Sequence, residues 1–346
     1  MHILFLANSA YPTGEAQYIT HLAQNLPKNK VDVSVIFASE GHPGIQGTVG
    51  LIEENVVSEL SFRAYKETWA NDVVAYINDA DVDVVVVGQL KFSQADPKTG
   101  ILATHSAEDI CSAAGVHSVF MAYDLDKLTF KNLGETNFDA YGSVSDLLAR
   151  FITGSSPTII PTVVRGCAVK PKSTGIDIRG YWGIAKEDTV LGYMGEFADA
   201  FGTDAIFEAA KQLGTRIFAC GWGNELAELD AYRDVVTLLP MIPTHRKEWY
   251  EAMDVFVYPV YSGAFPFYAM EAVMTGTPIV ITPIADMFSL FGDETMAFCS
   301  FNKTSSLVDG IKKARDMDMK PAQKIAANEL SLDKMVAGLI KLCKLV

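Results

Sequence analysis

Short apolar runs rich in β-branched residues recur along the chain, and polar turns or amphipathic segments separate them. In the first half these runs cover residues 1–7, 31–37, 81–87 and 116–122. The run at 81–87 is rich in valine, which is typical of a parallel strand buried on both faces. After the first run, apolar residues fall on one face of a helix predicted over 15–26. Strands and helices that alternate in this way predict a doubly wound α/β domain.

The same pattern restarts in the second half of the chain. Its predicted strands cover residues 189–194, 216–219, 235–239, 255–258 and 278–281, with a helix at 204–213. Between the two halves the periodicity fails in a stretch of Lys, Pro, Ser and Gly, which is typical of a linker. We therefore predict four parts: a first domain at 1–166, a linker at 167–180, a second domain at 181–330 and a final amphipathic helix at 331–346.

The segment 254–280 carries the strongest functional signal. It predicts a buried strand, a turn rich in Pro, Ser, Gly and Ala, and a helix that opens near Phe267 and carries Glu271. Such units direct free backbone N–H groups and the positive end of the helix dipole to the carboxyl edge of the sheet, where anions bind. A single carboxylate on the inner face of that helix suits the two hydroxyls of a ribose. A nucleotide site is therefore the first hypothesis, and an ordinary buried partner role for Glu271 is the alternative.

Composition limits the classes of partner. The chain has 346 residues, of which 49% are hydrophobic and 20% charged, as expected for a globular protein with two domains. The formal net charge of −14 disfavours a nonspecific hold on nucleic acid or on an anionic membrane. Five dispersed cysteines fit thiols in a reducing compartment, and the apolar start is too short for a signal peptide or a membrane-spanning helix. We expect a cytoplasmic protein without a transmembrane segment.

Several enzyme classes lose support from missing motifs. The six histidines show no metal-ligand spacing, so no metal site is predicted. No Gly-x-Gly-x-x-Gly follows the first strand, which weighs against a dinucleotide oxidoreductase, and no Gly-x-Ser-x-Gly elbow suggests a hydrolase. We predict no bound cofactor.

The order of motifs resembles the large retaining glycosyltransferase family of GT-B fold that includes relatives of sucrose and glycogen synthase. Pro12-Thr-Gly14-Glu-Ala-Gln17 is similar to the family's Gly-Gly-Ala-Glu loop, and Gly221-Trp-Gly-Asn224 to its Gly-Asp-Gly-Pro turn. Leu238-Leu-Pro-Met-Ile242 is similar to its base-facing segment, and Phe265-Pro266 with Glu271 to its donor loop and helix. The resemblance implies two Rossmann-like doubly wound domains that face each other across a cleft, with the final helix crossing back to the first domain.

The resemblance also implies where ligands bind. The donor nucleotide would contact Thr13, Gly14, Gly195, Glu196, Met241, Gly263, Ala264, Phe265 and Glu271. On the acceptor side, Tyr123 and Asp124 take the place of a catalytic pair, in which Asp124 would orient an acceptor hydroxyl; capping of the next helix is its structural alternative.

Three donor-site positions depart from the family pattern. Gly263 replaces a Glu, Glu196 replaces an Arg and Phe201 replaces a Lys. Cations for a diphosphate would then come from other loops, with Lys98, Lys127, Lys131, Arg165, Arg246 and Lys247 as candidates.

The implied activity is transfer of a sugar from a nucleotide-sugar co-substrate to the hydroxyl of an unknown acceptor, with retention of configuration and without a metal. Two alternatives stay open. A catalytically silent binding or partner protein on the same fold is favoured by the three departures above. A sugar-nucleotide epimerase shares the architecture.

Overall fold

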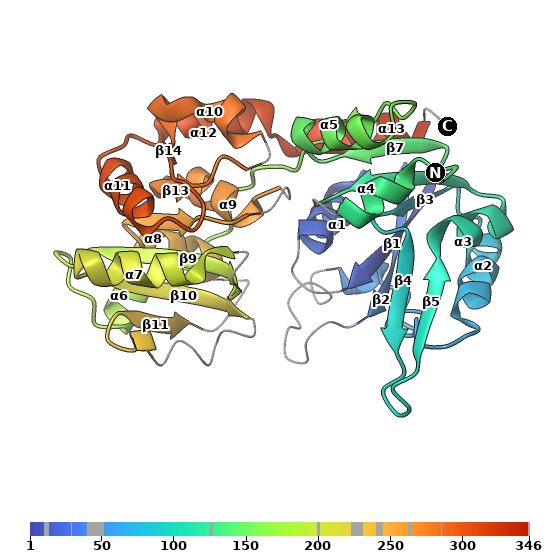
Figure 1. The fold of residues 1–346 in the computed structure, drawn as a ribbon, viewed down its shortest axis with the longest axis horizontal. Helices are drawn as coiled ribbons and strands as arrows, with labels where there is room; N and C mark the ends of the chain where they lie inside the picture. The colour runs from blue at the N-terminus through green and yellow to red at the C-terminus, as the bar shows by residue number, and fades with distance from the viewer. Residues whose placement is uncertain are drawn as a thin grey trace. The chain divides into compact units, whose positions relative to one another are not determined.

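The computed structural model describes residues 1–9, 14–28, 30–39, 52–124, 127–198, 201–222, 231–239, 245–261, 265–284 and 286–344. Contacts divide the chain into two compact units (Figure 1). Unit 1 comprises Met1–Gly166, Gly263–Phe265 and Leu332–Val346. Unit 2 comprises Cys167–Ser262 and Pro266–Ser331.

Unit 1 is built on a parallel sheet with the strand order β2-β1-β3-β6-β7-β8. These strands are β1 (His2–Ser9), β2 (Asp32–Ser39), β3 (Val84–Val87), β6 (His117–Ala122), β7 (Ala140–Ser143) and β8 (Thr162–Val163). An antiparallel hairpin of β4 (Lys91–Ala95) and β5 (Leu102–Ser106) stands apart from the sheet. The strand order reverses between β1 and β3, so ligands are expected near the C-terminal ends of those two strands.

The helices of unit 1 cover this sheet. They are α1 (Gly14–Asn25), α2 (Trp69–Asp79), α3 (Ala107–Ala114), α4 (Lys127–Leu133), α5 (Asp146–Ser155) and α13 (Leu332–Lys344), with a 3₁₀ turn at Glu53–Asn55. Helix α13 contacts α1 and β7 although most of the chain separates them in sequence. The hydroxyl of Tyr18 on α1 donates a hydrogen bond to the carbonyl of Val164 at 2.9 Å, which ties α1 to the last strand of the unit.

Unit 2 repeats the architecture with the strand order β11-β10-β9-β12-β13-β14, all parallel. The strands are β9 (Val190–Glu196), β10 (Arg216–Trp222), β11 (Val236–Leu239), β12 (Val255–Tyr258), β13 (Ile279–Ile281) and β14 (Ala297–Phe298). In chain order this is the Rossmann arrangement 3-2-1-4-5-6. Its reversal lies between β9 and β12.

Seven helices are described in unit 2: α6 (Ile178–Tyr181), α7 (Thr203–Leu213), α8 (Arg246–Ala252), α9 (Phe267–Thr275), α10 (Met287–Thr295), α11 (Thr304–Arg315) and α12 (Lys320–Glu329). Helix α9 ends at Gly276 in the left-handed conformation, with φ of 91°. A residue without a Cβ adopts this conformation readily, so the helix stops at this glycine.

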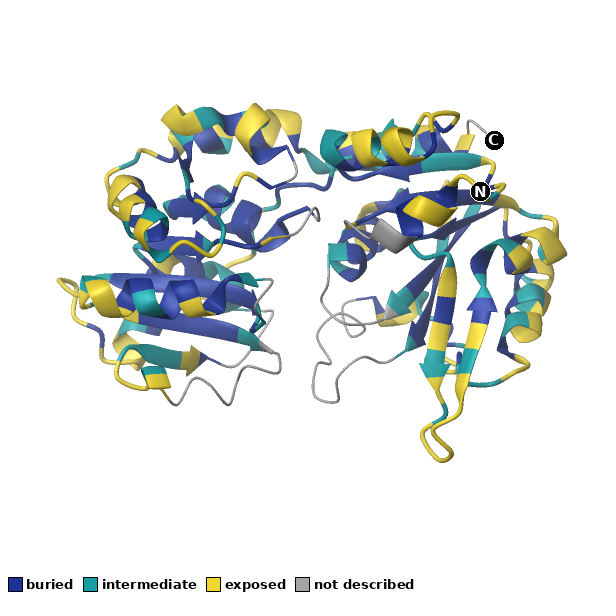
Figure 2. Cartoon of the chain, in the orientation of Figure 1, coloured by how far each residue is buried: buried dark blue, intermediate teal, exposed yellow. Residues whose placement is uncertain are grey.

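Burial follows the central strands in both units, which are dark blue in Figure 2. Strand β3 is buried along its whole length, as the valine-rich run predicts. In unit 2 a core cluster joins Leu191, Val255 and Val280 of the sheet to Ile206 of α7 and Ile311 of α11. No helix in the described part of the chain is long and apolar enough to cross a membrane.

The predicted fold class is confirmed. The last part of the chain forms two helices, α12 and α13, separated at Leu330 and Ser331, where the sequence predicts the end of the second domain and a final helix at 331–346. The β4–β5 hairpin was not predicted at all. Its strands bury only Phe92 and His105 fully, so no apolar run marks them.

Candidate functional site

Glu271 lies on α9 with its side chain almost completely enclosed, at 5% exposure. Arg246, the first residue of α8, has Nε 2.9 Å from Oε2 of Glu271. The hydroxyl of Tyr250 donates a hydrogen bond to the same oxygen at 3.1 Å and lies 3.7 Å from Sδ of Met194 in β9. One cation and one hydroxyl therefore hold Glu271 beside the C-terminal part of β9.

The remaining polar atoms of this group are incompletely paired within the described part of the chain. Oε1 of Glu271 makes no hydrogen bond there, and the buried Nε–H of Arg246 is not aligned for one. Burial raises the pKa of the Glu271 carboxyl, against the opposing effect of Arg246. Burial lowers the pKa of Arg246, but Glu271, Tyr250 and Tyr268 together outweigh this effect, so the pKa is raised and the guanidinium stays charged.

Gly195 and Glu196 end β9 at the reversal point of the second sheet. Gly195 pairs in register with Gly221 of β10, and a Cβ on Gly221 would lie 1.7 Å from the carbonyl oxygen of Gly195. The hydroxyl of Tyr193 donates a hydrogen bond to the backbone oxygen of Glu196 at 2.5 Å. The chain is thus closely packed where the family resemblance implies a donor contact.

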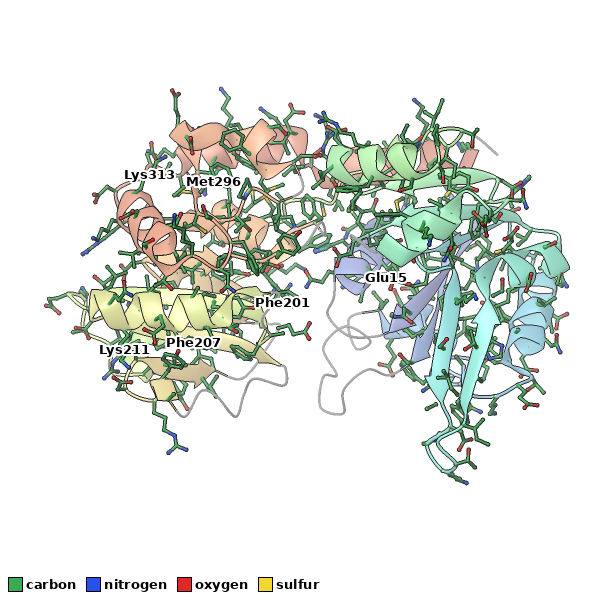
Figure 3. The ribbon with its side chains drawn as sticks, in the orientation of Figure 1. Glu15, Phe201, Phe207, Lys211, Met296 and Lys313 are labelled. Atoms are coloured by element: carbon green, nitrogen blue, oxygen red, sulfur yellow. The ribbon has the colours of Figure 1, made fainter. Side chains whose placement is uncertain are left out.

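Phe201 packs against the core cluster of unit 2, beside α7 (Figure 3). The aromatic ring replaces the Lys of the family pattern, and its packing against the core cluster accounts for an apolar residue there. No cation stands at either of the two family positions, 196 and 201.

In unit 1 a second buried carboxyl, Glu15, lies at the start of α1 (Figure 3). Its exposure is 9%, and Oε2 accepts a hydrogen bond from the backbone N–H of Asn8 at 3.3 Å. Oε1 has no partner among the described residues. Burial raises the pKa of Glu15 from its ordinary 4.5 to about 7, against the lowering effect of the Asn8 bond.

Glu15 meets residues that follow the two adjacent strands, β3 and β6. A Cβ built on Gly88 would lie 2.3 Å from Oε1 of Glu15 and 2.6 Å from Cδ2 of Tyr123. Tyr123 is buried, and its hydroxyl has no partner in the described part of the chain. Burial and the nearby Glu15 raise the pKa of this phenol well above its ordinary value. The C-terminal ends of β1, β3 and β6 therefore converge on one carboxyl and one phenol.

The other predicted site residues are placed as follows. Gly14 is the first residue of α1, and Asp124 is exposed directly after Tyr123 at the end of β6. Phe265 is buried, and its ring lies so close to Gly166 that a Cβ there would be 2.4 Å from Cδ1. Thr13, Met241, Gly263 and Ala264 lie outside the described residues.

The cations named as diphosphate candidates fall in different surroundings. Arg165 forms an ion pair with Asp146, and Lys247 pairs with Glu251 at 2.8 Å. Lys98 and Lys131 are exposed on unit 1, and the Lys127 side chain lies outside the described part of the structure. Arg246 is the candidate that lies beside Glu271.

Sequence reasoning treated Glu15 only as a helix start and missed Tyr250. No local sequence signal marks Glu15 or Tyr250 as a site residue, because the residues that enclose their side chains lie on other helices and strands. The pairing of Arg246 with Glu271 was also missed. Both residues flank the strand at 255–258, and this arrangement is the signal that could have placed them together.

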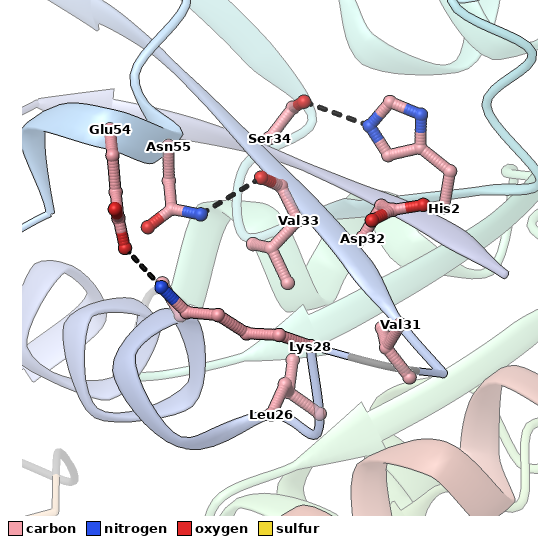
Figure 4. Close-up of a pocket in the computed structure, with 10 residues that line it drawn as sticks. His2, Leu26, Lys28, Val31, Asp32, Val33, Ser34, Glu54 and Asn55 are labelled. Atoms are coloured by element: carbon pink, nitrogen blue, oxygen red, sulfur yellow. Dashed lines mark hydrogen bonds and ion pairs between the residues drawn. The ribbon is translucent and has the colours of Figure 1, made fainter.

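Two pockets are lined by residues of unit 1. One, of about 290 Å³, lies at the N-terminal ends of β1 and β2, where His2 Nε2 is 2.8 Å from Ser34 Oγ (Figure 4). The other, of about 510 Å³, lies between Gln89, Lys91 and α4. The first is at the strand ends opposite to those where ligands of α/β sheets bind.

The described residues form neither a metal-binding cluster nor a disulfide. No group of three His, Cys, Asp or Glu side chains able to hold a metal ion occurs among the described residues. All five cysteines are described, and each is a buried thiol outside any disulfide. Burial raises the pKa of each of them, to about 12 in Cys111, Cys167, Cys299 and Cys343.

Comparison with known proteins finds a family match in the second unit. Residues 188–315 match the family model described as glycosyl transferases group 1. This segment contains β9 to β14, Arg246 and Glu271.

Curated relatives agree in class. The chain is 27% identical over 147 residues to a D-inositol 3-phosphate glycosyltransferase of Mycobacteroides abscessus, a match that covers 38% of the chain and 33% of the relative. It is 24% identical over 203 residues to the protein of the same name in Corynebacterium aurimucosum, covering 52% of the chain and 48% of the relative. The chain thus matches half or less of the length of these relatives.

Solved structures match over the whole chain. Anabaena HepE in complex with UDP and glucose has a TM-score of 0.76 at 15% identity, with 100% of both chains covered. Sucrose-phosphate synthase from Thermosynechococcus elongatus has a TM-score of 0.73 at 14% identity, with 99% and 98% covered. These similarities show the fold, which is GT-B.

Proposed function

We propose that this group 1 glycosyltransferase-like protein moves a sugar from a nucleotide-sugar donor to an acceptor hydroxyl. Unit 2 would bind the donor and unit 1 the acceptor. The observation that carries the proposal is Glu271, a nearly buried carboxylate beside the end of β9, with Oε1 unpaired among the described residues. This oxygen is able to accept a hydrogen bond from a ribose hydroxyl.

Support for the donor class comes from two directions. The family match covers the unit that contains Glu271, and a protein of the same fold was crystallised with UDP and glucose. Nucleoside diphosphates are the leaving groups of such donors. We therefore propose a nucleoside diphosphate sugar, with UDP as the first probe.

Binding of the donor is tested by thermal unfolding with UDP, GDP, ADP and TDP and their sugars. A ligand at a hundred times its dissociation constant adds about 2.7 kcal/mol of stability. Loss of the carboxylate in Glu271→Ala should weaken binding by about 10- to 100-fold, since a hydrogen bond to a charged group is worth roughly 1.5–3 kcal/mol. The proposal fails if the wild-type protein binds none of these compounds.

We further propose that transfer retains the anomeric configuration and needs no metal. The departing phosphate would take the acceptor's proton, so no side-chain base is required, and Asp124 would orient the acceptor. Product analysis by NMR reports the configuration, and activity in excess EDTA reports the metal requirement. The five cysteines are thiols outside any disulfide, which supports a reducing compartment, so we propose the cytoplasm, which cell fractionation tests.

A second candidate is a binding protein without turnover. Glu196 at the end of β9 and Phe201 against the core cluster support it, because neither supplies the positive charge that stabilises a leaving diphosphate. Nucleotide-sugar binding without hydrolysis or transfer to any acceptor would favour this candidate over the enzyme.

A further inference from the structure

Arg246 has three properties that suit an anion-binding residue. It is charged, it is anchored at Nε beside Glu271, and its side chain retains 21% exposure. Its Nη atoms donate no hydrogen bond to a described residue. Nε is committed to Oε2 of Glu271, 2.9 Å away, so the N–H groups of the Nη atoms are the donors that remain for a ligand.

The surroundings favour a ligand rather than another side chain. Arg246 opens α8, and Tyr250 of the same helix contacts Met194 near the end of β9. Arg246 and Glu271 therefore lie toward the carboxyl edge of the sheet, at its reversal point, where α/β proteins bind ligands. The chain carries a net charge of −14, so an anionic donor needs a local positive group.

We propose that Arg246 binds the diphosphate of the nucleotide donor through its Nη atoms, in place of the cations absent at positions 196 and 201. This inference rests on the proposed function and deepens it. A guanidinium presents a planar set of donors that matches two phosphate oxygens. Glu271 fixes the orientation of that fork through Nε and uses Oε1 for the ribose.

The test compares UDP with uridine, which lacks the phosphates. Titration calorimetry on Arg246→Gln should show UDP binding weakened by about 10- to 100-fold, as for loss of a charged hydrogen bond, with uridine binding changed by less than about threefold. Lys312→Gln is the control, because it removes the same charge from an exposed residue of α11 in the same unit. That control should bind UDP as the wild type does.

Arg246→Gln leaves Glu271 without its cation and could fail to fold, so a second variant is needed. Arg246→Lys keeps the charge but not the fork, and UDP affinity should fall by less than in Arg246→Gln. If Arg246→Gln loses equal affinity for UDP and for uridine, Arg246 only orients Glu271. If Arg246→Gln binds uridine more tightly than the wild type does, Arg246 competes with the ribose for Glu271. Either result, or unchanged UDP binding in both variants, overturns the inference and leaves the proposed function standing. Failure of the wild type to bind any nucleoside diphosphate overturns both.

Discussion

Replacing Glu15 with Gln should make the stability of the protein less dependent on pH. Burial raises the pKa of Glu15 to about 7, so the native state favours the protonated form. In the unfolded chain the carboxyl ionises near its ordinary 4.5. A raised native pKa contributes stability below the unfolded pKa, and that stability is lost as the pH rises toward the native pKa. Glutamine has nearly the same shape and does not titrate.

The magnitude follows from the two pKa values. The difference between 4.5 and about 7 corresponds to about 3.4 kcal/mol, at about 1.36 kcal/mol for each tenfold change in proton affinity. With 9% exposure, the side chain has little solvent to screen this cost. The wild-type free energy of unfolding should therefore fall by about 3 kcal/mol between pH 4.5 and 7 relative to Glu15→Gln, and the difference should be constant above that range.

Urea unfolding of both proteins across this pH range measures the effect, because titration of all other groups cancels in the difference. Glu53→Gln is the matched control: its carboxyl is exposed in the same unit, and its substitution should leave the pH profile unchanged. Parallel profiles for wild type and Glu15→Gln would show that Glu15 is ionised in the native state, and the reasoning from its burial would be refuted.

Two further changes test packing and the linker. Gly88→Ala should destabilise the protein by about 1–3 kcal/mol because its Cβ would lie 2.6 Å from the Tyr123 ring, whereas Gly154→Ala, with no atom within 4 Å, should be neutral or stabilising in thermal unfolding. Glu248 accepts hydrogen bonds from all three residues 173–175, which outweigh burial and lower its pKa to about 2. Glu248→Gln should therefore cost about 1 kcal/mol at neutral pH, a difference that disappears as the pH falls from 4.5 toward 2, and should speed proteolysis at 173–175. An unchanged rate of cleavage would show that the hydrogen bonds of Glu248 do not hold residues 173–175 in place.

Most strands of both sheets were predictable because parallel strands are buried on two faces and carry apolar runs. β3, β9 and β12 are examples, and each lies where its run predicts. β7 reads Ala-Tyr-Gly-Ser, which has no such pattern, and its place in the sheet depends on its neighbours β6 and β8. Local pattern therefore finds the central strands and misses those whose burial is a tertiary property.

The candidate site was predictable only where a residue's role depends on its own helix or loop. Glu271 was identified from the strand, loop and helix around it. The raised pKa of Glu15 depends on Gly88 and Tyr123, which are more than seventy residues away in sequence and adjacent only in the folded sheet. Phe201 could be recognised from the sequence as a departure from the family. Its packing against the core cluster of unit 2 depends on residues that only the fold brings together.

The contact of α13 with α1 and β7 has a consequence for biosynthesis. Residues 332–346 belong to unit 1, yet the ribosome makes them after all of unit 2. Domains generally fold in order as they emerge during synthesis. Here the contact between α13 and α1 forms only after unit 2 has been made, so the part of α1 that α13 contacts stays uncovered while unit 2 is synthesised, and chaperones have that interval in which to bind it.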